Sequence, residues 1–170
     1  HVRFNMIHHP CETDRILKSF KGNYREVVGA VISHLEKKSP LLAEQYTKRF
    51  QTLEKEIYLR PFLLKDVKDS DELIEKKDCR LRQAAIRKSN VSPGEMRFLF
   101  DSEIWERMDS FHKAGLIMHE IIYEHFFKLG EANSVKARKF NALIFSKEFD
   151  SFSKQDLYSY FQRQRIPIYQ

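Results

Sequence analysis

The stretch Gly115–Phe127, "GLIMHEIIYEHFF", predicts the central helix of this protein. At 100° per residue, apolar side chains reach almost all the way round this segment. A helix that is apolar on nearly every side has to be enclosed by other elements. We therefore expect a central helix from about residue 111 to residue 129, ended by Gly130, which adopts the left-handed conformation easily.

The rest of the composition fits one compact domain over residues 1–170. Hydrophobic residues make up 42% of the chain, enough to form a real core, and there are only five glycines. No apolar run reaches the roughly 20 residues that span a bilayer, because the most apolar stretch, 114–129, contains several charged side chains. The sequence therefore predicts a single domain without a membrane span.

Two further helices precede the central one. Apolar residues recur at helical spacing over 24–38, and the segment "KKSP" ends that helix because the residue before Pro40 avoids the α conformation. A second apolar stripe then runs to residue 57. We expect these two helices to form an antiparallel hairpin over 24–57.

In the middle of the chain the spacing of apolar residues is no longer helical. The segments "CRLRQAAIRK" and "MRFLFD" are typical of short strands, and the intervening "SNVSPGE" has the residues of a turn. Further helical patterns follow, with caps predicted near residues 101 and 133 and a last helix at about 154–164. The expected fold class is α+β, mostly helical, with a small antiparallel sheet in the middle of the chain.

The charge of the chain is positive but evenly spread. Its net charge is +6 and its pI about 9.3, which permits attraction to nucleic acid. Acidic residues alternate with the basic ones almost everywhere, as in "KDVKDSDELIEKKD", and this is typical of a solvated surface. No zinc finger, phosphate loop or RNA-binding aromatic signature is present, so the pattern argues against a nucleic-acid-binding protein.

His119 and Glu120 begin a zinc-hydrolase signature that the sequence does not complete. The His-Glu-x-x-His motif needs a second histidine one turn later, and Tyr123 occupies that position. A metal would need ligands from distant segments, for example His8 and His9. The sequence therefore predicts no metal ion and no other cofactor.

Two interpretations of the same cluster remain open. In one, His119 is a general base oriented by Tyr123 or Glu120, although no nucleophile motif accompanies it. In the other, which we favour, the cluster is structural, and its polar atoms are satisfied within the core. Glu120 would then pair with Arg138, so we expect Arg138→Ala to destabilise the fold far more than a change at Lys136, which we place on the surface.

The segment 79–146 resembles a family of uncharacterised secreted proteins of Gram-negative bacteria. The similarity rests on "CRLRQAAI" and on Ile104-Trp105, the run "AGLIMHEIIY" at 114–123, Asn133-Ser134, Ala137-Arg138, Phe140-Asn141, Leu143 and Ser146. The resemblance implies export and a shared domain, but no reaction. It implies as candidate catalytic positions His119, Glu120 and Tyr123, and as candidate binding positions Ser134, Arg138 and Asn141.

The two cysteines bear on the expected export. Cys11 and Cys79 can be two separate buried thiols, or one long-range disulfide if the protein is in an oxidising compartment. Export to the periplasm or the extracellular space, which the resemblance implies, favours the disulfide. Closing a loop of that length would stabilise the fold by roughly 4 kcal/mol. The chain opens on His1, so we expect any targeting segment to lie outside it.

Two functions follow as expectations. The leading one is an exported, non-catalytic binding or interaction domain whose partner is a protein or a cell-envelope ligand. The alternative is a hydrolase built round His119 and Glu120, metal-dependent or not, which acts on the cell envelope. The sequence leaves the ligand and the oligomeric state open.

Overall fold

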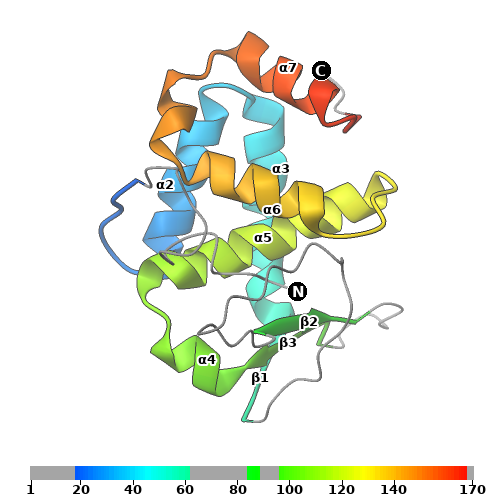
Figure 1. Ribbon diagram of the computed structural model, residues 1–170. Coiled ribbons are helices and arrows are strands. Elements are labelled where there is room, and N and C mark those ends of the chain that lie inside the picture. Colours follow the sequence, from blue (N-terminus) through cyan, green and yellow to red (C-terminus); the bar gives the residue numbers. More distant parts are fainter. Residues whose placement is uncertain (1–17, 62–83, 89–95, 168–170) are drawn as a thin grey trace, which may run out of the picture.

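The computed structural model describes residues 18–61, 84–88 and 96–167 (Figure 1). Its helices are α2 (Tyr24–Glu36), α3 (Pro40–Leu53), α4 (Ser102–Arg107), α5 (Ser110–Lys128), α6 (Val135–Ile144) and α7 (Lys154–Arg163), with the short 3-10 helices η1 (Glu54–Glu56) and η2 (Lys147–Ser151). Its strands are β1 (Ile57–Arg60), β2 (Ala85–Arg87) and β3 (Phe98–Asp101). The expected α+β class, mostly helical with a small sheet in the middle of the chain, is confirmed.

The predicted hairpin of helices is formed by α2 and α3, which pack against each other. Asn23 caps the start of α2 with a capping box. Its side-chain oxygen accepts hydrogen bonds from backbone N–H groups of the first turn, and the Glu26 carboxylate accepts one from the backbone N–H of Asn23. Pro40 is the first residue of α3, where its missing N–H costs nothing. The apolar stripes of both helices face the core.

Helix α5 is central, as its apolar sequence predicts. It crosses the middle of the molecule and packs against α2, α3 and α6 (Figure 1). Asp109 caps its first turn, and Gly130 follows its end with a φ of +97°. Nearly every residue from Ala114 to Ile122 is buried, so α5 is the element around which the other helices assemble.

The sheet is mixed rather than antiparallel throughout. β2 and β3 pair antiparallel, with Ala85 opposite Phe100, as the two strand-like segments predict. β1 pairs parallel to the other side of β3, with Ile57 opposite Phe98, so β3 is the middle strand. The extended segment after α3 is too short to show a clear alternation, and its direction depends on a long-range connection that no local pattern encodes.

The apolar side chains of the two halves of the described chain belong to one core. Residues from α2, α3, β3, α5, α6 and α7 form a single buried cluster that is rich in phenylalanine. None of the helices that the structure describes combines the length and the apolarity that crossing a bilayer requires. Cys11, Cys79, His8 and His9 lie outside the described residues, so the disulfide and the histidine pair stay predictions.

Candidate functional site

The three candidate catalytic residues lie on α5 beneath the surface. The His119 side chain is 1% exposed and Glu120 is 3% exposed, while Tyr123 is half-buried. The rings of His119 and Tyr123 are neighbours, with centroids 6.0 Å apart. Burial, together with the positive charge of Arg138, lowers the pKa of His119 to about 3. His119 is therefore a neutral imidazole inside the core at physiological pH.

The three candidate binding residues lie at or in α6, and all of them are buried. Ser134 begins the helix, and Arg138 is 7% exposed. The Asn141 side-chain amide donates to the Gly115 carbonyl oxygen at 3.0 Å and so links α6 to α5. Asn141 is therefore placed to hold two core helices together, and Ser134 and Arg138, which precede it in the sequence, are buried as well.

Two buried polar atoms of this cluster have no hydrogen-bond partner among the described residues, namely His119 Nε2 and Asn141 Oδ1. The predicted burial of His119 and Glu120 is confirmed. The predicted contact of Glu120 with Arg138 stays a prediction, since the described influence of the Arg138 charge is on His119. Among residues 18–61, 84–88 and 96–167, no three metal-ligating side chains come together.

Arg138→Ala should lower the free energy of unfolding by about 2 kcal/mol or more, because it removes a charged side chain that is only 7% exposed, and a charge is kept in such a place only where the fold compensates it. Lys136 is a poor control, since its side chain is only 28% exposed and its ammonium pairs with Glu131 at 2.5 Å. Lys139, exposed on the same helix, is the matched control. Urea unfolding of both alanine variants measures the difference; equal stabilities would contradict a structural role for Arg138.

A second polar cluster, which the sequence did not indicate, is centred on Arg49 of α3. Its guanidinium donates to Glu124 of α5 at 2.8 Å, to both carboxylate oxygens of Glu56 at 2.8 and 2.9 Å, and to the Thr52 hydroxyl at 2.8 Å. It also lies over the ring of Phe98 in β3, 5.8 Å from the centroid. One side chain thus joins the helical hairpin, the central helix and the sheet.

Glu124 is the buried end of this cluster. It is 3% exposed and also accepts from the Lys128 ammonium at 2.7 Å, while Arg97 lies 3.9 Å away. Burial alone would raise the pKa of Glu124, but the hydrogen bonds and charges of Lys128 and Arg49 outweigh it and hold that pKa below its usual value. Glu124 is therefore ionised at neutral pH, and its charge is compensated.

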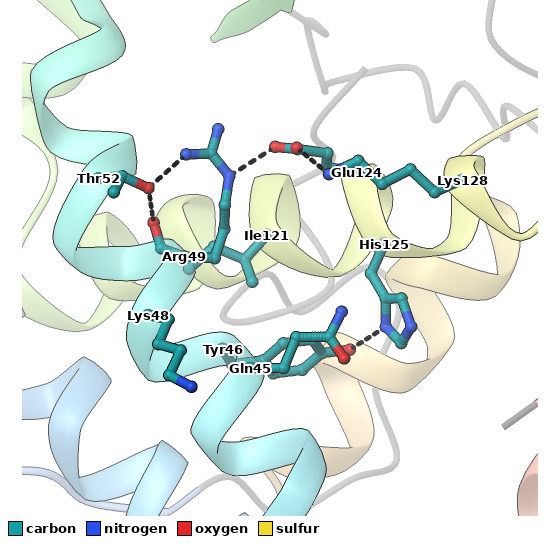
Figure 2. A pocket seen from close by; sticks show the side chains of 9 residues that line it. All are labelled: Gln45, Tyr46, Lys48, Arg49, Thr52, Ile121, Glu124, His125 and Lys128. Atoms are coloured by element: carbon teal, nitrogen blue, oxygen red, sulfur yellow. Dashed lines mark hydrogen bonds and ion pairs between the residues drawn. The ribbon is translucent and has the colours of Figure 1, made fainter. Parts of the chain in front are cut away.

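A cavity of about 300 Å³ opens beside the Arg49–Glu124 pair, between α3 and α5 (Figure 2). We call it the polar cavity; it is lined by Gln45, Tyr46, Lys48, Arg49, Thr52, Ile121, Glu124, His125 and Lys128. Figure 2 shows Arg49 between Thr52 and Glu124, with Lys128 against the far side of that carboxylate. Arg49 is also paired with Glu56, and Lys48 with Glu44, so the charges around this cavity largely compensate one another.

Next to it lies a cavity of about 380 Å³, formed by α3, the end of α5, and α7. We call it the apolar cavity; its lining is Lys38, Ser39, Pro40, Leu41, Leu42, Gln45, His125, Leu129, Lys154, Leu157, Tyr158, Phe161 and Pro167. Two lysines and no acidic side chain belong to this lining. Leu41 is 66% exposed, so part of the apolar wall faces solvent.

The two cavities share Gln45 and His125, and together we call them the groove. At this junction the Tyr46 hydroxyl and His125 Nδ1 share a hydrogen bond of 3.1 Å (Figure 2). Burial, and secondarily the Lys128 charge, lowers the pKa of His125 to about 4, while burial raises the pKa of Tyr46 above its usual value. Both side chains are therefore uncharged at neutral pH, and they form a neutral bridge between α3 and α5.

The groove and the candidate catalytic cluster are separate features. His119, Glu120 and Tyr123 line neither of the two cavities, and neither do Ser134, Arg138 and Asn141. The sequence carried one signal for the groove, because His125 lies on the apolar face of α5 and Tyr46 on the apolar stripe of α3. Two polar rings on facing apolar stripes indicate a paired contact, which is what the structure contains.

Comparisons with known proteins add nothing to this geometry: no family model matches the chain, and neither a curated protein nor a solved structure is similar to it.

Proposed function

We propose that this chain is a non-catalytic binding domain of an exported protein and that the groove is its ligand site. The observation that carries the proposal is the pair of adjoining cavities, one apolar and one polar, which open along α3 and share two lining residues. Ligand sites are typically concave, largely apolar and supplied with a few placed polar groups, and cavities of a few hundred Å³ are common for them. The groove has each of these properties.

The hydrolase alternative has no comparable support. A general base has to come within hydrogen-bond reach of its substrate, and His119 is enclosed in the core with a pKa far below neutral. The groove, in turn, brings together no nucleophile and activating base: its histidine is bonded to a tyrosine, and its carboxylate is bonded to Arg49 and Lys128. Binding without chemistry is the function that this arrangement favours.

Filling the junction of the two cavities should abolish binding. Gln45 is exposed and lines both cavities, so Gln45→Trp blocks the groove without disturbing the core. The matched control is Gln162→Trp, at an exposed position of α7 that lines neither cavity. The probe is N-phenyl-1-naphthylamine, a neutral apolar dye whose fluorescence rises on burial.

We expect about one equivalent of this dye to bind the parent protein and the Gln162→Trp variant, and binding to fall at least tenfold for Gln45→Trp. Circular dichroism and thermal melts confirm that both variants are folded. If the parent does not bind the dye, or if both tryptophan variants bind it as well as the parent does, the groove is not a ligand site and the proposal fails.

We include export in the proposal because residues 79–146 resemble secreted proteins. In an exported protein we expect Cys11 and Cys79 to form a disulfide. Thiol titration of the non-reduced protein in denaturant should therefore detect no free thiol, and a reductant should lower the unfolding free energy by roughly 4 kcal/mol. Two titratable thiols in protein isolated from its native compartment would contradict both the disulfide and the export.

A further inference from the structure

The apolar cavity differs from the polar cavity in the state of its basic side chains. In the polar cavity Lys48 and Lys128 are each paired with a glutamate. The lysines of the apolar cavity are Lys38, which follows α2, and Lys154, the first residue of α7. Among the residues that the structure describes, neither of these two forms an ion pair; Lys38 lies over the Phe149 ring at 5.3 Å, and Lys154 is exposed. A ligand of the apolar cavity can therefore meet them without displacing a carboxylate.

Two carboxylates come near these lysines, Asp150 in space and Asp156 in sequence, but both have other partners. The Lys18 ammonium, 2.6 Å away, and more weakly the Lys38 charge hold the pKa of the Asp150 carboxyl below its usual value. Asp156 accepts from the backbone N–H and the hydroxyl of Ser153 at 2.8 and 2.7 Å. Of the described residues that line the apolar cavity, only the two lysines are charged at neutral pH.

The start of α3 lies in the wall of the same cavity. Ser39 and Pro40 belong to the lining, and the Ser39 side chain does not cap the helix. Pro40 has no N–H group, and the N–H groups of Leu41 and Leu42 in the first turn have no acceptor within the helix. The partial positive charge of a helix start attracts anions, so it acts in the same direction as the two lysines.

Most of the remaining wall is apolar. Leu42, Leu157 and Phe161 are almost fully buried and form the floor of the cavity, while Leu41 is exposed at its rim. A volume of about 380 Å³ lies at the lower end of the range for ligand sites. The cavity therefore suits one short apolar chain rather than the two chains of a membrane lipid.

We propose that the ligand of the groove is a single-chain amphiphile of medium length with an anionic head, of which a free fatty acid is the simplest example. The inference rests on the proposed function of the groove. The chain of the ligand fills the apolar cavity, and its head lies beside Lys38, Lys154 and the start of α3. Burial of the chain supplies most of the affinity, and the cations select the head and orient the ligand.

The length of the chain tests the apolar part of the site. Hexanoate, octanoate and decanoate are titrated into the parent protein loaded with N-phenyl-1-naphthylamine. Each methylene that enters the cavity should tighten binding about fourfold, so each step of two carbons should lower the displacing concentration by a factor of about fifteen. Dioctanoylphosphatidylglycerol, a two-chain lipid with an anionic head, should displace the dye at least tenfold more weakly than decanoate does when it is kept below its micelle concentration.

The head group tests the cationic part of the site. Decanoate should displace the dye about fivefold more tightly than decanol, and decyltrimethylammonium should bind more weakly than decanol. The double variant Lys38→Gln, Lys154→Gln should bind decanoate and decanol about equally. Lys139→Gln, a change at an exposed position of α6 outside both cavities, should keep the preference of the parent. Dye binding by these variants shows that the groove is intact.

The result that overturns the inference differs from the one that overturns the proposed function. If the dye binds but decanoate does not displace it, or the three ten-carbon head groups displace it equally, the inference is wrong and the proposed function stands. A lysine double variant that keeps the full preference for decanoate also overturns the inference, as does a two-chain lipid that binds as tightly as decanoate. If the dye itself does not bind the parent, the proposed function is wrong and the inference fails with it.

Discussion

Lowering the pH from 7 to 5 is expected to reduce the free energy of unfolding by roughly 4 kcal/mol, because the buried His119 and the partly buried His125 must stay neutral in the folded protein. The pKa of His119 is about 3 and that of His125 about 4, against 6.5 for an ordinary histidine. Between these values the unfolded chain binds protons that the folded protein excludes. Each histidine then contributes a loss of roughly 2 kcal/mol over the window from pH 6.5 to pH 5.

The sign follows from the direction of the shifts. A depressed histidine pKa gives stability that is complete above pH 6.5 and is lost as the pH falls towards the folded-state pKa. Since a domain of this kind is stable by only about 5–15 kcal/mol, the effect should bring it close to unfolding in mild acid. Urea titrations at pH 7, 6 and 5, followed by circular dichroism, measure it directly.

Substituting each histidine shows how much of the loss of stability in acid it causes. His119→Gln and His125→Gln should each remove about half of the loss between pH 7 and pH 5, and the double variant should lose most of its pH dependence in this window. Glutamine at 125 can keep a hydrogen bond to the Tyr46 hydroxyl. A parent protein that is equally stable at pH 7 and pH 5 would show that neither ring is held neutral by the fold.

Arg49→Met should destabilise the protein by about 3 kcal/mol, since it removes the partly buried partner of the buried Glu124 and leaves that carboxylate with an exposed lysine and an arginine 3.9 Å away. Methionine retains most of the apolar stem, so the loss is chiefly electrostatic. The matched control is Arg107→Met: Arg107 is 75% exposed and pairs only within α4, so its loss should cost no more than a few tenths of a kcal/mol.

A second substitution tests the cause. If the cost of Arg49→Met is the uncompensated charge of Glu124, then adding Glu124→Gln should restore a large part of the stability instead of adding to the loss. Urea unfolding of the two single variants and the double variant gives the coupling energy. Additive losses, with no coupling between the two positions, would mean that the pair does not act as a unit.

The sequence predicts the helical part of this fold because that part depends on local pattern. The apolar residues of α5 leave almost no solvent-facing side, and those of α2 recur at 3.6-residue spacing, so in both segments the pattern predicts a buried helix face. The antiparallel pairing of β2 with β3 follows from two extended segments with turn residues between them. The parallel pairing of β1 does not, since its partner lies about forty residues away and any of several registers would satisfy the same side chains.

The candidate site was harder to predict, again for a physical reason. Glu120 and Arg138 drew attention because they are near in sequence, whereas Arg49 and Glu124, 75 residues apart, form the ion pair that the structure describes. The lining of the groove comes mostly from α3, α5 and α7 and includes four lysines, four leucines and a glutamine. Such residues gain meaning only when tertiary packing brings them together, so their spacing along the chain carries no signal.

The parallel pairing of β1 with β3 also has a consequence for how the chain folds. The α2–α3 hairpin forms from contacts between near neighbours, whereas β1 can meet β3 only after some forty intervening residues have closed into a crossover. Closing such a loop costs entropy before the pairing returns any stability, and folding rates fall as contacts become less local. We therefore expect the α2–α3 hairpin to form early in folding. The pairing of β3 with β1 and β2 is then the slow step that limits the folding rate.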